Sequence, residues 1–131
     1  MDLIKERFTL SKEERLCSRK ALEELFEGSN KSMLAYPIRA VFQKTEETGI
    51  RIMVSVSKRF FKRAVKRNRI KRQLREAYRL NKHILKPATG GLNIAFLWIS
   101  NDILPTQKVM DRMQNLLTKI NESVAHTPSS V

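Results

Sequence analysis

One segment of this chain, residues 58–82, holds almost all of its excess positive charge. It contains twelve Lys or Arg residues and a single acid, Glu76, so it carries +11 of the formal net charge of +13. Such a segment can fold only if its charges stay in solvent, which leaves a narrow apolar stripe for packing. Wound as a helix over residues 63–82, the segment has this stripe, formed by Ile70, Leu74, Ala77 and Tyr78. The sequence therefore predicts a helix that packs on a core with one side only.

The opposite side of this helix repeats positive charge. It carries Asn68, Arg72, Arg75 and Arg79, with Lys71 and Lys82 on one flank and Arg69 on the other. Because like charges one helical turn apart repel by roughly a few tenths of a kcal/mol, the pattern favours an anionic partner over a solvated face. Lys66 and Arg67 fit neither side. They are expected in the first turn, where backbone N–H groups attract phosphate.

The charge balance makes nucleic acid the first class of partner and anionic membrane the second. The membrane is disfavoured because the apolar side of the helix lacks the Trp and Phe residues that anchor interfacial helices. No apolar run reaches the roughly 18 residues of a membrane span, and segment 1–10 is too charged for a signal peptide. The sequence predicts one soluble, cytoplasmic domain over residues 1–123 and a disordered tail over 124–131.

The first half of the chain predicts one helix and two strands. A helix is expected over 19–27, with Ser18 as its N-cap and Gly28 at its end, followed by a loop up to Ser32. Residues 36–44 and 50–57 are expected to form two strands that pair as a hairpin. The basic helix would cover the apolar face of this hairpin.

The second half of the chain predicts one strand and one helix. Residues 92–99, LNIAFLWI, are apolar on both faces apart from Asn93, which predicts a central strand. A last helix is expected from Thr106. Its core positions recur at helical spacing: Val109, Met113, Leu116, Leu117 and Ile120.

No group of residues suggests catalysis by the protein itself. The acids are scattered, Cys17 is the only cysteine, and His83 and His126 lie far apart in the chain. Hydrolysis of a phosphodiester by a protein usually needs clustered carboxylates that hold metal ions, or a His pair for acid–base work. The sequence therefore predicts no catalytic residue, no metal site and no cofactor bound by the protein.

Three motifs resemble the pattern of the bacterial ribonuclease P protein subunit. They are SVSKR at 55–59, AVKRNRIKR at 64–72 and REA at 75–77. The first helix ending near Phe26 and the final strand and helix extend the resemblance over nearly the whole chain. It implies an α+β two-layer sandwich in the order α-β-β-β-α-β-α, as in the second domain of a small-subunit ribosomal protein. Its central mixed sheet would have a left-handed βαβ crossover, whereas the sequence pattern alone favours the right-handed connection.

The resemblance also implies a function. The protein would bind the catalytic RNA of ribonuclease P as a 1:1 ribonucleoprotein and contact the 5′ leader of precursor tRNA. It would promote endonucleolytic removal of this leader to give the mature 5′ end. Catalysis and the use of Mg²⁺ would belong to the RNA subunit, and neither a membrane nor an obligate protein partner is implied.

Matching positions imply two sets of site residues. The contact with the RNA subunit would use Lys58, Arg59, Lys62, Arg63, Lys66, Arg67, Asn68, Arg69, Lys71, Arg72 and Arg75. The leader would lie in a cleft between the first helix and the sheet, formed by Phe26, Arg39, Phe42 and Arg51. Phe26 and Phe42 fit a core role equally well. One departure from the family pattern is Phe61, which stands where Gly is frequent.

Two other classes of function remain open. A general structured-RNA or ribosome-associated module on a similar fold would bind RNA without promoting cleavage of precursor tRNA. A helix for protein or membrane interaction would bind acidic proteins or acidic vesicles better than RNA of equal charge.

Overall fold

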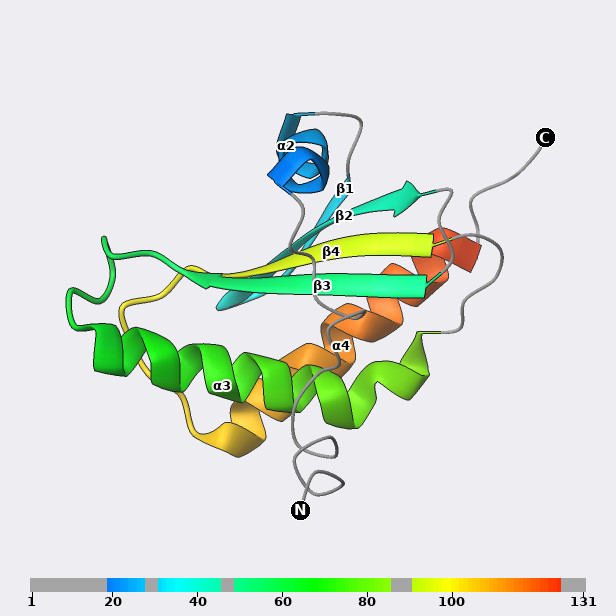
Figure 1. Ribbon diagram of the computed structural model, residues 1–131. Helices are drawn as coiled ribbons and strands as arrows, with labels where there is room; N and C mark the ends of the chain where they lie inside the picture. The colour runs from blue at the N-terminus through cyan, green and yellow to red at the C-terminus, as the bar shows by residue number, and fades with distance from the viewer. Residues whose placement is uncertain (1–18, 28–30, 46–48, 86–90, 126–131) are drawn as a thin grey trace, which may run out of the picture.

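A computed structural model describes residues 19–27, 31–45, 49–85 and 91–125 of the chain. Its elements are α2 (Arg19–Glu27), β1 (Lys31–Ala35), β2 (Ile38–Thr45), β3 (Gly49–Val56), α3 (Ala64–Asn81), the 3-10 helix η2 (Lys82–Ile84), β4 (Gly91–Trp98) and α4 (Thr106–Ala125). Helices α3 and α4 lie against one face of the sheet and α2 against the other (Figure 1). The fold is α+β, in the order that the resemblance implied.

Some predicted features lie outside the described residues. These are the cap at Ser18, the helix end at Gly28 and residues 126–131 of the tail. Val124 and Ala125 are described, and they continue helix α4 past the predicted domain boundary.

The strand order differs from the predicted hairpin. The order is β1-β2-β4-β3, with β3 parallel to β4, and β2 antiparallel to β1 and β4. Strand β4 is central, as its apolar sequence predicted, and it is buried along nearly its whole length. The hairpin of β2 with β3 is wrong, because β4 lies between them. Since β4 is apolar on both faces, its insertion buries more apolar surface than a direct β2–β3 pair would.

The resemblance predicted a strand at the position of β1. The residues of this segment did not, because they predicted a loop up to Ser32. It pairs with β2 from Lys31, opposite Phe42, to Ala35, opposite Ile38. Residues 36 and 37, predicted as the beginning of a strand, form the turn between β1 and β2. Strand β1 lies at the edge of the sheet, and its residues Lys31 and Ser32 are exposed. Because its sequence does not alternate between apolar and polar residues, its formation depends on pairing with β2.

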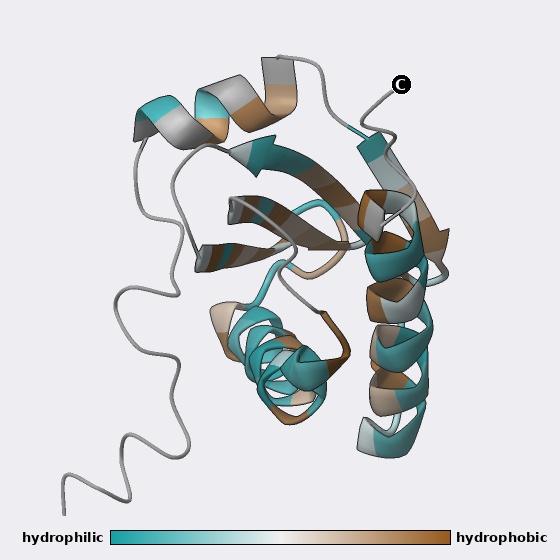
Figure 2. Ribbon diagram, turned by 90° about the vertical axis from the view of Figure 1, so that its right-hand side faces the viewer, coloured by the Kyte–Doolittle hydropathy of each residue, from teal (hydrophilic) through white to brown (hydrophobic). Residues whose placement is uncertain are grey.

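The crossover from β3 through α3 to β4 is left-handed (Figures 1 and 2). With strand order and direction fixed, the hand of the crossover decides which face of the sheet α3 covers. The face toward α3 carries Ile52, Val54 and Val56, whereas the other face carries Arg51 and Ser55. A right-handed path would have placed α3 over these polar residues, so the apolar face of β3 accounts for the observed hand.

The main core lies between the sheet and the helices α3 and α4, and Figure 2 shows the apolar side of α4 facing inward. Helix α3 contributes the predicted stripe and one further residue: Ile70, Leu74, Ala77, Tyr78 and Asn81. All five predicted core residues of α4 are buried: Val109, Met113, Leu116, Leu117 and Ile120. A smaller core lies beneath α2, where Leu25 packs with Val41 and Ala95.

Candidate nucleic-acid interface

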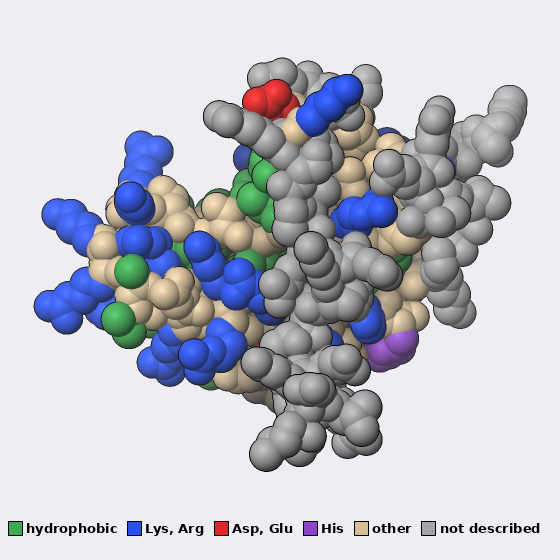
Figure 3. Space-filling view, in the orientation of Figure 1, with side chains coloured by type: hydrophobic (Ala, Val, Ile, Leu, Met, Phe, Trp, Pro, Cys, Tyr) green, Lys and Arg blue, Asp and Glu red, His purple; other side chains and the backbone are tan. Residues whose placement is uncertain are grey.

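The loop between β3 and α3 and the exposed side of α3 form one basic surface, here named the α3 basic surface. It contains all eleven residues that matched the family's RNA contacts. Nine of them are exposed: Lys58, Arg59, Lys62, Arg63, Lys66, Asn68, Arg69, Arg72 and Arg75. Arg67 and Lys71 are half-buried. Figure 3 shows Lys and Arg side chains gathered at the left, over this loop and the first turns of α3.

The start of α3 adds backbone donors to this surface. The helix begins at Ala64 with Arg63 as its N-cap residue, and no side chain caps it. Its first turn contains no acid and holds Lys66 and Arg67, as predicted. The first N–H groups of a helix lack partners within the helix and carry positive partial charge. The basic side chains and the start of α3 therefore both favour an anionic group such as phosphate.

Hydrogen bonds hold the basic loop in one conformation. The Ser57 hydroxyl oxygen accepts from the Arg59 N–H at 3.1 Å, and the Ser57 carbonyl accepts from the N–H groups of Phe60 at 3.1 Å and Phe61 at 3.3 Å. The Phe61 side chain is only 7% exposed and belongs to the main core. No non-glycine residue in the described ranges has a positive φ, so Phe61 occupies this position without the backbone conformation that requires Gly.

Arg67 ties this loop to the first turn of α3. Its Nη1 donates to the carbonyl oxygens of Phe61 at 2.8 Å and Lys62 at 2.7 Å. Family matching assigned Arg67 to RNA contact, but in the structure one guanidinium nitrogen holds the protein's own backbone. The two carbonyl groups come within reach of Arg67 only when the loop is folded. Helical periodicity in the sequence therefore could not predict this role. Arg67 is therefore a positioning residue of the α3 basic surface.

The charges of α3 are compensated unevenly. Arg79 forms an ion pair with Glu76 one turn away, which reduces the charge at the C-terminal end of the predicted basic side. Arg69 and Arg72 make no ion pair with any residue that the structure describes. The uncompensated charge is therefore concentrated toward the start of the helix and the loop before it.

The four residues assigned to the cleft beneath the first helix are not brought together. Phe26 on α2 is 46% exposed, Arg39 on β2 is exposed, and Arg51 on β3 is half-buried. Phe42 is 3% exposed and packs in the main core, on the face away from α2. Side chains alternate along a strand, so Arg39 and Phe42, three residues apart, point to opposite faces. The assignment of Phe42 to the cleft is therefore wrong.

The surface is hollowed between α2 and the basic loop (Figure 3). Met53 and Leu97 are partly buried members of the apolar cluster beneath α2, on this face of the sheet. This face therefore combines apolar side chains with the cations Arg39 and Arg51 of β2 and β3.

The described ranges contain no candidate for a membrane-spanning helix or for a metal site. None of the helices there combines the length and the hydropathy that a membrane-spanning helix needs. Nor does that part of the chain group three or more His, Cys, Asp or Glu side chains in a way that suits a metal ion.

Comparisons with known proteins agree on one family. The family model "Ribonuclease P" matches residues 10–121. The ribonuclease P protein component of Porphyromonas gingivalis is 41% identical over 130 residues, covering 94% of this chain and 92% of that protein. That of Chlorobaculum tepidum is 43% identical over 56 residues, or 43% of this chain and 36% of that protein.

Solved structures show the same fold. The RNase P protein from Thermotoga maritima superimposes with a TM-score of 0.69 at 25% identity, covering 81% of this chain and 96% of that one. The Staphylococcus aureus RNase P protein gives a TM-score of 0.66 at 19% identity, covering 82% and 94%. At that identity the second likeness concerns the fold alone.

Proposed function

This chain belongs to the ribonuclease P protein family, and from that membership we propose that it binds the RNA subunit of ribonuclease P through the α3 basic surface. In this complex it also contacts the 5′ leader of precursor tRNA and promotes removal of the leader. Its partners are the ribonuclease P RNA, in a 1:1 ribonucleoprotein, and precursor tRNA in the cytoplasm.

The observation that carries this proposal is the uncompensated charge at the loop and the first turns of α3. Seven assigned cations, from Lys58 to Arg72, are exposed there, and Arg69 and Arg72 have no carboxylate partner in the described residues. Ordered cations without ion pairs suit phosphate groups, because binding them releases counterions from the nucleic acid. Contacts of this kind read the backbone and the shape of RNA rather than its base sequence.

The apolar side of α3 argues against the membrane alternative. Ile70, Leu74, Ala77 and Tyr78 are at most 1% exposed in the core. An interfacial helix must insert its apolar side into the lipid, which here would require α3 to leave the sheet. The charged side of α3 remains available, and it favours RNA.

The face beneath α2 supports the contact with the leader. Phe26 exposes nearly half of its side chain, and Arg39 and Arg51 lie on β2 and β3, the two strands that flank β4 in the mixed sheet. An exposed aromatic ring can stack on an unpaired base while a cation binds the adjoining phosphate. We assign Phe26, Arg39 and Arg51 to this contact, without Phe42.

In this proposal the protein is a non-catalytic subunit. Its described acidic residues include Glu76, which is paired with Arg79, and Asp111, which accepts from Gln107 Nε2 at 3.1 Å. Mg²⁺ belongs to the RNA subunit, and no step of the reaction uses a metal ion held by this chain. The contribution of the protein is to bind and position the two RNAs.

The proposed function is tested by cleavage of precursor tRNA at low Mg²⁺ with a bacterial ribonuclease P RNA, with and without this protein. The wild type is expected to raise the cleavage rate strongly. The double variant Arg69→Gln, Arg72→Gln should lose most of this gain. Its plot of log K against log salt for RNA binding should flatten by about two units, because two phosphate contacts are removed.

A matched control removes two exposed charges away from α3, by Lys31→Gln and Lys44→Gln on β1 and β2. It should retain the cleavage gain and nearly the full salt slope. Equal slopes for the two double variants would remove the α3 basic surface from the proposal. Tight RNA binding by the wild type without any gain in cleavage would instead identify a general RNA-binding module.

Phe26→Ala is expected to weaken binding of precursor tRNA by about 1 to 3 kcal/mol, while binding of mature tRNA stays unchanged, because only the precursor has a leader base to stack. The measurement compares both affinities with the reconstituted holoenzyme. The matched variant Phe42→Ala should instead affect the stability of the fold. It should lower the free energy of unfolding by about 3 to 5 kcal/mol without selectivity for the leader. An equal loss of affinity for precursor and mature tRNA in Phe26→Ala would contradict the stacking role.

A further inference from the structure

Helix α4 carries a second row of cations, outside the basic segment 58–82. Lys108, Arg112 and Lys119 are exposed and lie on one flank of the helix, since they are four and seven residues apart. The row is about 17 Å long at 1.5 Å per residue. Helical spacing was the available signal, but the core residues between these cations dominated the pattern. We name this row, together with Tyr36 in the turn after β1, the α4 strip.

Two of these cations are held by neutral groups of the protein. Arg112 Nε donates to the carbonyl oxygen of Tyr36 at 2.9 Å, and Lys119 Nζ donates to that of Leu34 at 3.1 Å. Neither cation has an ion pair within the described ranges. A carbonyl orders a side chain without cancelling its charge. Both cations therefore keep their full charge and further N–H donors for an external anion.

An aromatic side chain is exposed at the turn that Arg112 contacts. Tyr36 is 60% exposed, although its carbonyl oxygen accepts a hydrogen bond from α4. Capping the free edge of β1 would explain the bonds from Arg112 and Lys119. It explains neither the exposed ring of Tyr36 nor the charge of Lys108. Cations next to an exposed aromatic ring are the combination that binds single-stranded nucleic acid.

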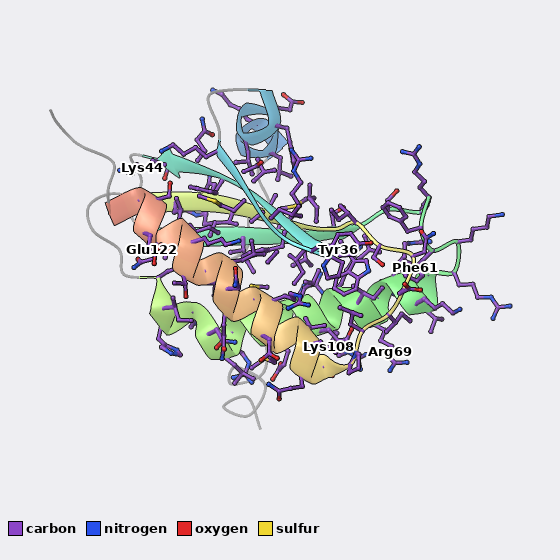
Figure 4. All side chains as sticks on the ribbon, turned by 180° about the vertical axis from the view of Figure 1, so that it is seen from behind. Tyr36, Lys44, Phe61, Arg69, Lys108 and Glu122 are labelled. Carbon is purple, nitrogen blue, oxygen red and sulfur yellow. The ribbon has the colours of Figure 1, made fainter. Side chains whose placement is uncertain are left out.

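The α4 strip adjoins the α3 basic surface. Gln73 of α3 donates through Nε2 to the carbonyl oxygen of Leu104 at 3.1 Å and to the Thr106 hydroxyl at 3.3 Å, which fixes the start of α4 against α3. Figure 4 shows Arg69 of α3 and Lys108 of α4 at the same end of the molecule as Tyr36. An RNA on the α3 basic surface can therefore continue past Lys108 to the edge of the sheet.

We propose that the α4 strip is a second RNA-binding surface, which holds an unpaired RNA segment by its phosphates and by one base stacked on Tyr36. Lys108, Arg112 and Lys119 bind the phosphates. The proposal rests on the function proposed above, and it adds a second RNA-binding surface on α4. It concerns an unpaired segment because only an unstacked base can lie on the exposed ring.

The test measures binding of the full chain to a uridine oligonucleotide and to a bacterial ribonuclease P RNA over a range of salt concentrations. Each of Lys108→Gln, Arg112→Gln and Lys119→Gln is expected to flatten the salt slope for the oligonucleotide by about 0.7. Tyr36→Leu should weaken oligonucleotide binding about fivefold to 100-fold at constant salt slope, because it removes stacking and no charge. Lys44→Gln, at the other end of the sheet in Figure 4, is the charge-matched control and should change neither quantity.

Arg112 and Lys119 also hold the turn after β1 and β1 itself, so the unfolding of every variant is measured in parallel. Lys108→Gln removes no hydrogen bond within the described residues and reports charge alone. Slopes equal to that of Lys44→Gln, together with unchanged binding by Tyr36→Leu, would overturn the α4 strip. If Arg69→Gln, Arg72→Gln still flattens the slope in that case, the proposed function stands without the strip. If that variant is also without effect, the strip and the α3 basic surface both fall.

Discussion

Replacing Arg67 by alanine is expected to weaken binding of the RNA subunit more than replacing Arg72, although each change removes one positive charge. Arg67 Nη1 donates to the carbonyl oxygens of Phe61 and Lys62 at 2.8 and 2.7 Å. Hydrogen bonds that involve a charged group are worth about 1.5 to 3 kcal/mol, and the part-buried bond to Phe61 is expected to contribute more than the exposed bond to Lys62. Their loss releases the loop that carries Lys58 and Arg59. RNA binding must then order this loop again, so several contacts weaken together.

The measurement is a double-mutant cycle on RNA affinity. Arg67→Ala is combined first with Lys62→Ala in the loop and then with Arg72→Ala on the exposed side of α3. We expect a coupling of about 0.5 to 3 kcal/mol in the first cycle and additive effects in the second, because only the first pair shares the loop. Arg67→Lys should recover little, since an ammonium group does not reproduce the planar guanidinium. Equal losses for Arg67→Ala and Arg72→Ala, additive in both cycles, would return Arg67 to a simple phosphate contact.

The properties of α3 were predictable because they are local. The buried stripe of Ile70, Leu74, Ala77 and Tyr78 repeats at the helical period, and the charge on the other side follows from the same winding. The central position of β4 was also predictable, because a strand that is apolar on both faces must be covered on both. These features need only the residues of one segment.

The features that the sequence missed depend on contacts between distant segments. Strand β3 pairs with β4 and not with β2 because β4 is inserted between them. This order depends on all the strands of the sheet together, so the residues of one strand do not predict it. Phe42 follows two buried neighbours, Ala40 and Val41, so alternation alone did not fix its face. The internal bonds of Arg67 require the loop to be folded first. The residue types of the basic surface were therefore predictable, whereas the internal hydrogen bonds that distinguish Arg67 from its exposed neighbours were not.

Phe61→Gly is expected to lower the free energy of unfolding by about 3 to 5 kcal/mol, although the family pattern that the sequence resembles would place Gly here. Phe61 is 7% exposed in the main core, and loss of its ring leaves a cavity beneath the basic loop. Glycine would also increase the conformational freedom of the unfolded chain, which adds a further loss of about 0.4 to 1 kcal/mol. In this chain the ring of Phe61 is part of the main core.

Urea denaturation of three variants separates the core role of Phe61 from its backbone role. Phe61→Leu keeps most of the apolar volume and should cost well under half of the loss in Phe61→Gly. Phe60→Gly changes the neighbouring, half-buried residue and should cost less than Phe61→Gly, because less of its ring is buried. An unchanged urea midpoint for Phe61→Gly would mean that the ring does not pack in the core. Since Arg67 binds the Phe61 carbonyl while the core holds its side chain, both anchors act on one residue. Combining Phe61→Gly with Arg67→Ala should therefore cost less in RNA affinity than the sum of the single changes, because either one alone already frees the loop.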